Sequence, residues 1–140
     1  MKQYPTEVYT ELVKLIRDDD TNSRQWLLDN GYREWIEFCD ANDGKENSFQ
    51  WLMEHGHRAF AATIDALSGS DSAKVFLIRS GQKELAAFVD ASKGNKSAVA
   101  VLIRLQEKGL IQVAHELYMR NKKEEKKSFW SFLNFGNPFR

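Results

Sequence analysis

Apolar residues recur along this chain at helical spacing, and the whole pattern repeats every 25 residues. The segment Trp26–Gly31 reads Trp-Leu-Leu-Asp-Asn-Gly, and similar segments begin at Trp51, at Phe76 and, less regularly, at Val101. The copies follow one another from residue 26 to residue 105 without insertions. A fixed period of this length indicates one structural unit that is built several times.

Two glycines in each unit mark the points where short helices should end. Glycine readily adopts the left-handed backbone conformation that ends many helices. The two sets lie at fixed offsets: Gly31, Gly56 and Gly81 in one, and Gly44, Gly69 and Gly94 in the other. Ser70 and Asn95 directly follow a glycine and are suited to cap the next helix. We therefore expect helices at about 46–55 and 71–80, and at about 32–42, 57–67 and 82–92.

The spacing of apolar residues within these segments predicts the fold class. It is helical throughout, and no stretch alternates with a period of two for long enough to form a sheet. Helices of about ten residues are too short to be stable alone in water, so neighbours must hold them. We expect an all-α protein without a β-sheet: a right-handed-type α-solenoid of short antiparallel helix pairs, with about nine helices and a repeat of 25 residues.

The two ends depart from the repeat. A first helix at about 6–17, with Thr6 as its N-cap, should cover one end of a repeat region at about 24–116. Gly109 should bend or end a helix, and a closing helix at about 110–127 should stop near Ser128. The sequence thus divides into a helical-repeat domain, residues 1–127, and an aromatic C-terminal segment, residues 128–140.

The C-terminal segment carries the strongest functional signal. Five of its thirteen residues are aromatic, and it has no charge before Arg140. The aromatic residues are Phe129, Trp130, Phe132, Phe135 and Phe139. Three roles remain open for them: covering the open end of the stack, docking a partner, or contacting a membrane surface, since basic residues stand just ahead.

Charge and composition narrow the function classes. Lys plus Arg equal Asp plus Glu at 20 each, so we expect no nucleic-acid partner. No segment approaches the roughly 18 apolar residues of a membrane span, and the N-terminus lacks the apolar run of a signal peptide, so we expect a cytoplasmic protein. Cys39 is the only cysteine and should be a small buried apolar residue.

Three repeated aspartates, Asp40, Asp65 and Asp90, lie near helix C-termini, where the helix dipole disfavours a negative charge. The favoured interpretation is that their carboxylates accept hydrogen bonds from backbone amides of turns or helix starts. The alternative is a row of acceptors for a basic peptide or a metal. Three consecutive aspartates at 18–20 are interpreted as turn and capping residues rather than metal ligands.

A basic residue also repeats, at Arg33, Arg58, Lys83 and Lys108. It could form a ridge for an acidic partner, but the favoured interpretation is solvated surface charge, or pairing with nearby acids such as Glu34 and Glu84. The His55-Gly56-His57 turn has no acidic or Cys residue nearby to complete a tetrahedral zinc site, and we expect these histidines to be variable surface positions. We predict no metal site and no cofactor.

The repeated segments resemble short helical-repeat proteins in architecture. Trp-Leu-Leu-Asp-Asn-Gly-Tyr at 26–32 is similar to the leucine-leucine-x-x-glycine end of an ankyrin second helix. The period is 25 residues rather than about 33, and the Thr-Pro-Leu-His opening of ankyrin is missing; the unit is also shorter than tetratricopeptide and HEAT units. The resemblance covers about residues 24–116. It implies a scaffold that binds other macromolecules, and no site residue is carried over from it.

No glycine-rich phosphate loop, nucleophile elbow or His-Glu-x-x-His motif is present, so we predict no catalytic residues. The preferred function is a non-catalytic protein–protein interaction scaffold that binds through the repeat surface or the C-terminal segment. A peripheral membrane or secretion-associated adaptor acting through residues 120–140 is the first alternative, and a small enzyme or metal protein is the second. We expect a monomer or an end-to-end dimer, since an uncapped apolar end would pair with another.

Overall fold

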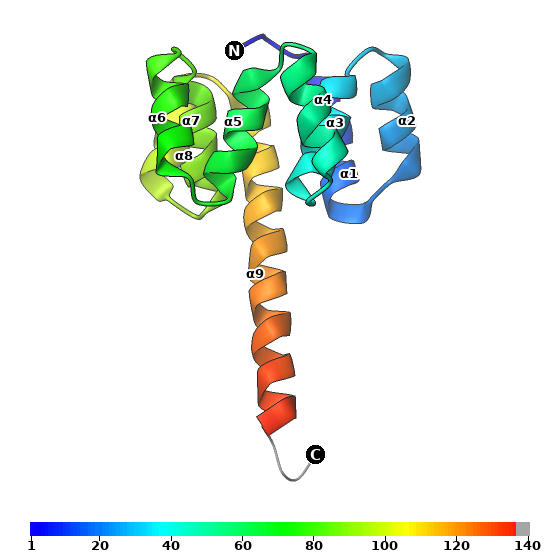
Figure 1. Cartoon of the computed structure of the whole chain (residues 1–140), viewed down its shortest axis with the longest axis vertical. Coiled ribbons are helices and arrows are strands. Elements are labelled where there is room, and N and C mark those ends of the chain that lie inside the picture. The colour runs from blue at the N-terminus through cyan, green and yellow to red at the C-terminus, as the bar shows by residue number, and fades with distance from the viewer. Residues whose placement is uncertain (137–140) are drawn as a thin grey trace.

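Helices make up the secondary structure of the computed structural model, which describes the backbone of residues 1–136 and the side chains of residues 1–127. Within that backbone there are nine helices and no strands (Figure 1). The all-α prediction is therefore confirmed. The helices are α1 (Thr6–Asp18), α2 (Thr21–Asp29), α3 (Arg33–Asn42), α4 (Glu46–Glu54), α5 (Arg58–Leu67), α6 (Asp71–Arg79), α7 (Lys83–Ser92), α8 (Lys96–Arg104) and α9 (Lys108–Gly136).

The predicted helix positions agree with the structure within one residue for the central units, and they recur every 25 residues. The helices α4, α6 and α8 begin at Glu46, Asp71 and Lys96, and α5, α7 and α9 begin at Arg58, Lys83 and Lys108. The first helix of the series, α2, begins at Thr21, earlier than the expected start of the repeats at about 24.

Helix ends follow the glycine pattern. All six repeated glycines have positive φ, from 77° at Gly81 to 106° at Gly69. At Gly31 the amide donates to the Leu28 carbonyl, and the next amide, of Tyr32, donates back to the Leu27 carbonyl at 2.8 Å. This pair of bonds satisfies carbonyls at the end of α2 that would otherwise lack partners. Similar backbone bonds close the helix ends at Gly69 and Gly81.

Helix starts are capped by side chains in three units. The side chains of Asp20, Ser70 and Asn95 each accept a hydrogen bond from the amide three residues later. The expected cap at Thr6 is wrong: Pro5 holds the N-cap position of α1 and makes no side-chain cap bond. The missing amide hydrogen and fixed backbone angle of proline suit it to a helix start, and Thr6 becomes the first helical residue.

The helices fall into two layers, and the more deeply buried, odd-numbered helices make the inner one. They bury the largest side chains, including Trp35, Phe38 and Phe88. The even-numbered, outer helices each bury one leucine completely, at Leu27, Leu52, Leu77 and Leu102, and most of their other residues stay exposed or half-buried. Contacts join α3 to α5, α5 to α7 and α7 to α9, and each outer helix contacts its two neighbours in the inner layer.

The inner layer closes on itself, because α1 packs against α9 as well as against α2. At this seam, a Cβ placed on Gly109 would lie 2.1 Å from Cδ2 of Tyr9, so only glycine lets the two helices approach so closely. The same Tyr9 ring also meets the ring of Trp35 edge to face, with the ring centroids 6.1 Å apart. Gly109 therefore lies in the first turn of α9 instead of ending a helix, and α1 does not cover an open end of a stack.

The last helix is longer than expected and leaves the domain. Residues 119–127 of α9 are all exposed, including the apolar Met119. The backbone stays helical through Gly136, whereas the sequence predicted a stop near Ser128. Figure 1 shows this part of α9 extending alone from the two-layered domain. No helix in the described part of the chain is both long and apolar enough to cross a bilayer.

Candidate interaction groove

A groove opens between the outer helices α4 and α6, and α5 forms its floor. It holds a volume of about 480 Å³. The residues that line it are mostly apolar or small: Phe49, Met53, Arg58, Ala61, Ala62, Asp65, Ser70, Ser72, Ala73 and Phe76. The groove exists because α4 and α6 both rest on α5, while the short side chains of Ala61 and Ala62 leave the space between them unfilled.

Exposed apolar side chains line the groove walls. Met53 on α4 is 40% exposed, and Phe76 on α6 is 45% exposed. Met53 also belongs to a repeated set, because each outer helix exposes a large apolar residue at the same position of the unit: Leu28, Met53, Ile78 and Ile103. Apolar surface that is repeated and left in water is typical of a binding surface.

Two of the repeated aspartates are held by side-chain cations instead of the backbone amides that we expected. Asp40 forms a bidentate pair with Arg24, at 2.8 and 3.0 Å, and Asp90 pairs with Lys74 at 2.7 Å. The turn amides of Lys45 and Asn95 do reach these residues, but they donate to the main-chain carbonyls. The hydrogen-bonded Arg24 guanidinium lowers the pKa of Asp40 below its usual value.

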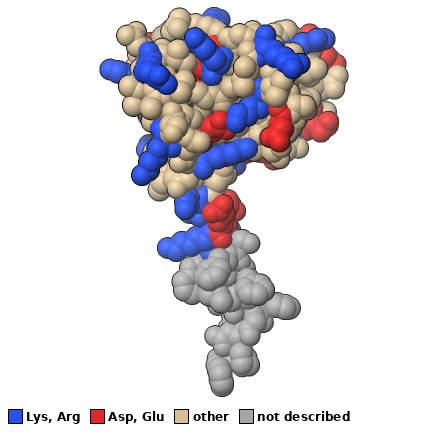
Figure 2. Space-filling model, turned by 90° about the vertical axis from the view of Figure 1, so that its left-hand side faces the viewer, with Lys and Arg blue, Asp and Glu red and all other residues tan. Residues whose placement is uncertain are grey.

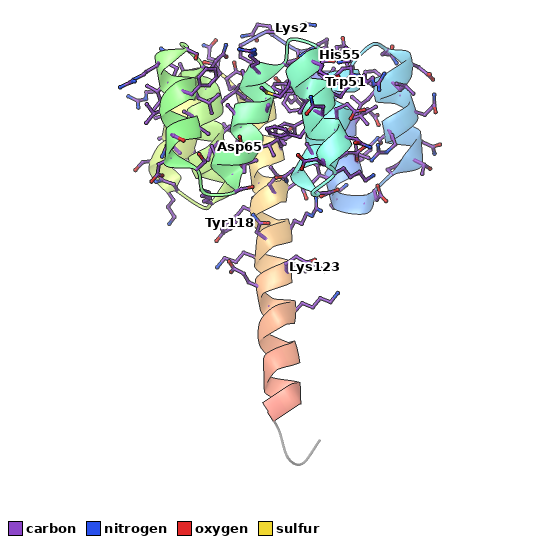
Figure 3. All side chains as sticks on the ribbon, viewed as in Figure 1. Lys2, Trp51, His55, Asp65, Tyr118 and Lys123 are labelled. Carbon is purple, nitrogen blue, oxygen red and sulfur yellow. The ribbon has the colours of Figure 1, made fainter. Side chains whose placement is uncertain are left out.

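Asp65 differs from its two counterparts. The cation that pairs with Asp40 or Asp90 stands sixteen positions earlier in the chain, and for Asp65 that position is Phe49. Among the described residues, no ion pair or side-chain hydrogen bond reaches the Asp65 carboxylate, which is exposed at the groove (Figure 3). The groove thus combines apolar walls with two charged residues that form no ion pair among the described residues, Asp65 and Arg58.

The repeated basic residues do not form the expected pairs. Arg33 lies over the ring of Trp51, with Cζ 4.6 Å from the ring centroid, and its Nε is 3.4 Å from Glu37. Arg58 is exposed and lines the groove, and Lys83 is exposed as well. The expected pairing of these cations with Glu34 and Glu84 is wrong, because both glutamates are buried beside the N-terminal residues.

Those N-terminal residues lie over one end of the inner layer, which sequence reasoning did not reveal. The chain's amino group is 2.7 Å from Glu84 Oε1, and the Tyr4 hydroxyl donates to Glu34 Oε2 at 3.0 Å. Glu107 faces the same segment through Gln3, and burial together with the nearby Glu84 raises the pKa of Glu107. The partners are separated by 30 to 104 positions, and no local pattern signals such contacts.

The histidine turn is an aromatic stack. The rings of His55 and His57 lie nearly parallel to that of Trp51, with centroids at 4.2 and 5.5 Å, and Trp51 and His55 lie together in Figure 3. His115 is remote from them, on α9. No group of three or more His, Cys, Asp or Glu side chains within residues 1–127 is placed to hold a metal ion. Burial raises the pKa of the Cys39 thiol to about 12, so it stays protonated at neutral pH.

A second hollow, of about 550 Å³, lies between α1 and α9. Its charged residues have partners within the chain: Arg17 lies 3.9 Å from Glu116, and Lys14 lies 3.4 Å from Glu11. Its lining includes the side chains of Val13, Ile111 and His115 but no Phe, Tyr or Trp. We therefore take the α4–α6 groove, with its aromatic walls and uncompensated carboxylate, as the better candidate for recognition.

Positive charge concentrates in the second half of the chain. Residues 1–70 contain seven Lys or Arg and thirteen Asp or Glu, whereas residues 71–127 contain twelve and seven. Figure 2 views the side of the domain that α6, α7 and α8 form, and Lys and Arg dominate that face. The exposed cations there include Arg79, Lys93, Lys96 and Arg104.

The aromatic residues of the C-terminal segment lie beyond the described side chains. Phe129, Trp130, Phe132 and Phe135 fall on the helical backbone of α9, and Phe139 lies outside the described residues altogether. Comparisons of the chain with protein families, with curated proteins and with solved structures found no match.

Proposed function

We propose that the chain is a non-catalytic protein–protein interaction scaffold of the helical-repeat type. In this proposal the 25-residue units form a right-handed-type α-solenoid whose inner layer positions the outer helices as a binding surface. The α4–α6 groove carries the proposal. A partner would cover its apolar walls, whose exposure to water is otherwise unfavourable.

Three features of the groove support protein recognition over small-molecule chemistry. The groove lies between two helices, six of its ten lining residues are apolar, and the large residues among these six are flexible or aromatic. Methionine and phenylalanine at such a surface adapt to a partner side chain and contribute large contact area. An amphipathic helix or an extended peptide would bury Met53 and Phe76 together.

Site-specific photocrosslinking would test the proposal. A photoreactive phenylalanine analogue at Met53 is expected to crosslink one discrete protein in cells, and the product should disappear when Phe76 is changed to Ser. The matched control carries the analogue at Gln25, an exposed position on α2 outside the groove. Equal labelling at the two positions would contradict the proposal, because the groove would then be no better a contact than ordinary surface.

A second candidate function is a peripheral membrane or secretion-associated adaptor that acts through residues 120–140. The observation that favours it is the extension of α9 away from the domain. Exposed Lys122, Lys123, Lys126 and Lys127 precede the aromatic residues on this helix. Basic residues attract anionic lipid headgroups, and aromatic residues settle at the membrane interface.

Vesicle flotation would separate the two candidates. If the adaptor function holds, the full chain should float with vesicles that contain phosphatidylserine and remain behind with vesicles of phosphatidylcholine alone. Changing Phe129, Trp130 and Phe132 to Ser should abolish flotation, whereas Met53→Ser should have no effect. Absence of flotation with either vesicle type would eliminate the adaptor function and leave the scaffold.

A further inference from the structure

We propose that the α4–α6 groove binds the basic and aromatic C-terminal end, residues 126–140, of a second copy of this chain. This inference rests on the proposed scaffold function and names the partner of the same groove. The groove supplies apolar walls and one free carboxylate, and the chain end supplies aromatic side chains next to cations.

Asp65 lacks the internal cation that pairs with its counterparts Asp40 and Asp90. In the flanking units an internal Arg24 or Lys74 neutralises the corresponding carboxylate. Phe49 replaces that cation in the middle unit, so the carboxylate and an aromatic wall stand side by side on one groove. A ligand that brings its own Lys or Arg would restore the pair that the repeat makes internally.

The apolar walls define the rest of the ligand. Phe49, Met53 and Phe76 offer a surface that favours aromatic or aliphatic anchors, and Ala61 and Ala62 leave the space above the floor open to admit them. Within this sequence, Lys126-Lys127-Ser128-Phe129-Trp130-Ser131-Phe132 places two cations directly before three aromatic residues. It therefore carries cations that can pair with Asp65 and aromatic residues that suit the apolar walls of the groove.

The geometry of α9 directs this end toward another molecule. The helix leaves the domain as one continuous rod through Gly136 (Figure 1). The groove lies between α4 and α6, with α5 as its floor. A straight helix does not return its end to the domain from which it extends. Docking on a second copy needs no such return.

The distribution of charge also favours the second copy. Two of the three groove helices, α4 and α5, fall in the acidic half of the chain, whereas α6 and α9 fall in the basic half. Bringing the basic end of one copy to the acidic half of another places opposite charges together and steers the encounter. Two copies can exchange ends reciprocally, which gives a closed dimer.

Sedimentation velocity of the full chain over a range of concentrations would test the inference. We expect a concentration-dependent dimer that weakens with added salt. Asp65→Asn should raise the dimer dissociation constant about fivefold, and Ser at Phe129, Trp130 and Phe132 should raise it at least about a hundredfold. Glu7→Gln is the control: it makes the same charge change at an exposed carboxylate outside the groove, so its dissociation constant should match the unaltered chain.

Exchanging the charges of the groove and of the chain end provides the decisive experiment. The variants Asp65→Lys and Lys126→Glu/Lys127→Glu, with folding checked by circular dichroism, should each self-associate weakly. In a mixed dimer, the unaltered Lys126 and Lys127 of one copy meet the unaltered Asp65 of the other. In the reciprocal contact, the introduced glutamates meet the introduced lysine. A mixture of the two variants should therefore form mixed dimers more tightly than either variant pairs with itself. Mixed dimers no tighter than the single-variant dimers would overturn the inference.

Other outcomes also decide the question. A full chain that stays monomeric at all concentrations, or a dimer unaffected by Asp65→Asn and by the aromatic substitutions, overturns the inference. If the aromatic substitutions abolish binding to phosphatidylserine vesicles but leave association unchanged, the inference also fails, because the chain end then belongs to the membrane. Crosslinking of a different protein at Met53 would then still support the scaffold function, whereas loss of both signals would remove both proposals.

Discussion

Two residues adopt a backbone conformation that the other units assign to glycine. Asp19, with φ of 50°, stands 25 positions before Gly44, and Gln106, with φ of 59°, stands 25 positions after Gly81. Both residues adopt the left-handed conformation, although a side chain makes this conformation less favourable by about 1 kcal/mol. The repeat geometry therefore outweighs the local preference of the residue.

Gln106→Gly should raise the free energy of unfolding by about 0.5–1 kcal/mol, because relief of the left-handed strain exceeds the entropy that glycine adds to the unfolded chain. Gly81→Gln, at the equivalent position, should lower it by about 1 kcal/mol. Urea unfolding followed by circular dichroism would measure both. Equal stability of Gln106→Gly and the unaltered chain would show that the strain is absent.

The aspartates give a pH-dependent prediction. Arg24 lowers the folded-state pKa of Asp40, so the stabilisation is present above the unfolded pKa of about 3.9 and is lost as the pH falls through the folded value. Asp40→Asn should therefore cost about 1 kcal/mol at pH 7 and much less at pH values below the folded pKa. Asp65→Asn, which breaks no pair, should change stability little at any pH. Thermal unfolding of both variants across the acidic range would compare them.

At the scale of helices, features that depend on residues near in the chain could be predicted from the sequence. Features that depend on contacts between distant residues could not. Gly44 and Ser70 act within a few residues of their positions in the chain, and the helix boundaries around them were predictable. Gly109 was misinterpreted because its partner, Tyr9, lies 100 positions earlier. The groove shows the same division: the exposed Met53 and free Asp65 depend on how α4, α5 and α6 pack, although Phe49 in the place of a cation was visible in the sequence.

Gly109→Ala should destabilise the α1–α9 seam by about 1–2 kcal/mol, since the new methyl group displaces the Tyr9 ring at a cost larger than the helix preference of alanine recovers. A double-mutant cycle measured by urea unfolding would test the cause. In a Tyr9→Ala background the same substitution should stabilise the protein, by up to about 1 kcal/mol. An equal cost in both backgrounds would exclude the ring contact as its origin.

At the scale of the molecule, the contact of α1 with α9 joins the two ends of the repeat region. In an open array each unit contacts only its neighbours, and units can unfold one after another. Here the loss of one unit would also separate α1 from α9 and uncover Tyr9, which is 6% exposed. The domain should therefore unfold as one cooperative system. The end-to-end dimer stays a prediction, and because α1 packs against α9, no open apolar end of the repeat region supports it.

Removing one unit, residues 46–70, should abolish cooperative unfolding rather than leave a shorter stable protein. The remaining helices have the same sequences and caps, but the inner layer lacks α5 and cannot bring α9 beside α1. Heat-capacity measurements and amide proton exchange would show a broad transition and weak protection. A sharp transition near that of the intact chain would contradict this expectation.

The seam at Gly109 also constrains how this protein can change over evolution. Open repeat proteins lengthen and shorten by duplicating or losing units, and their binding surfaces grow with them. A closed arrangement admits only the number of units that brings its last helix back to its first. Diversity must then arise by substitution within a fixed set of units, and the presence of Phe49 where other units place a paired cation is one such difference.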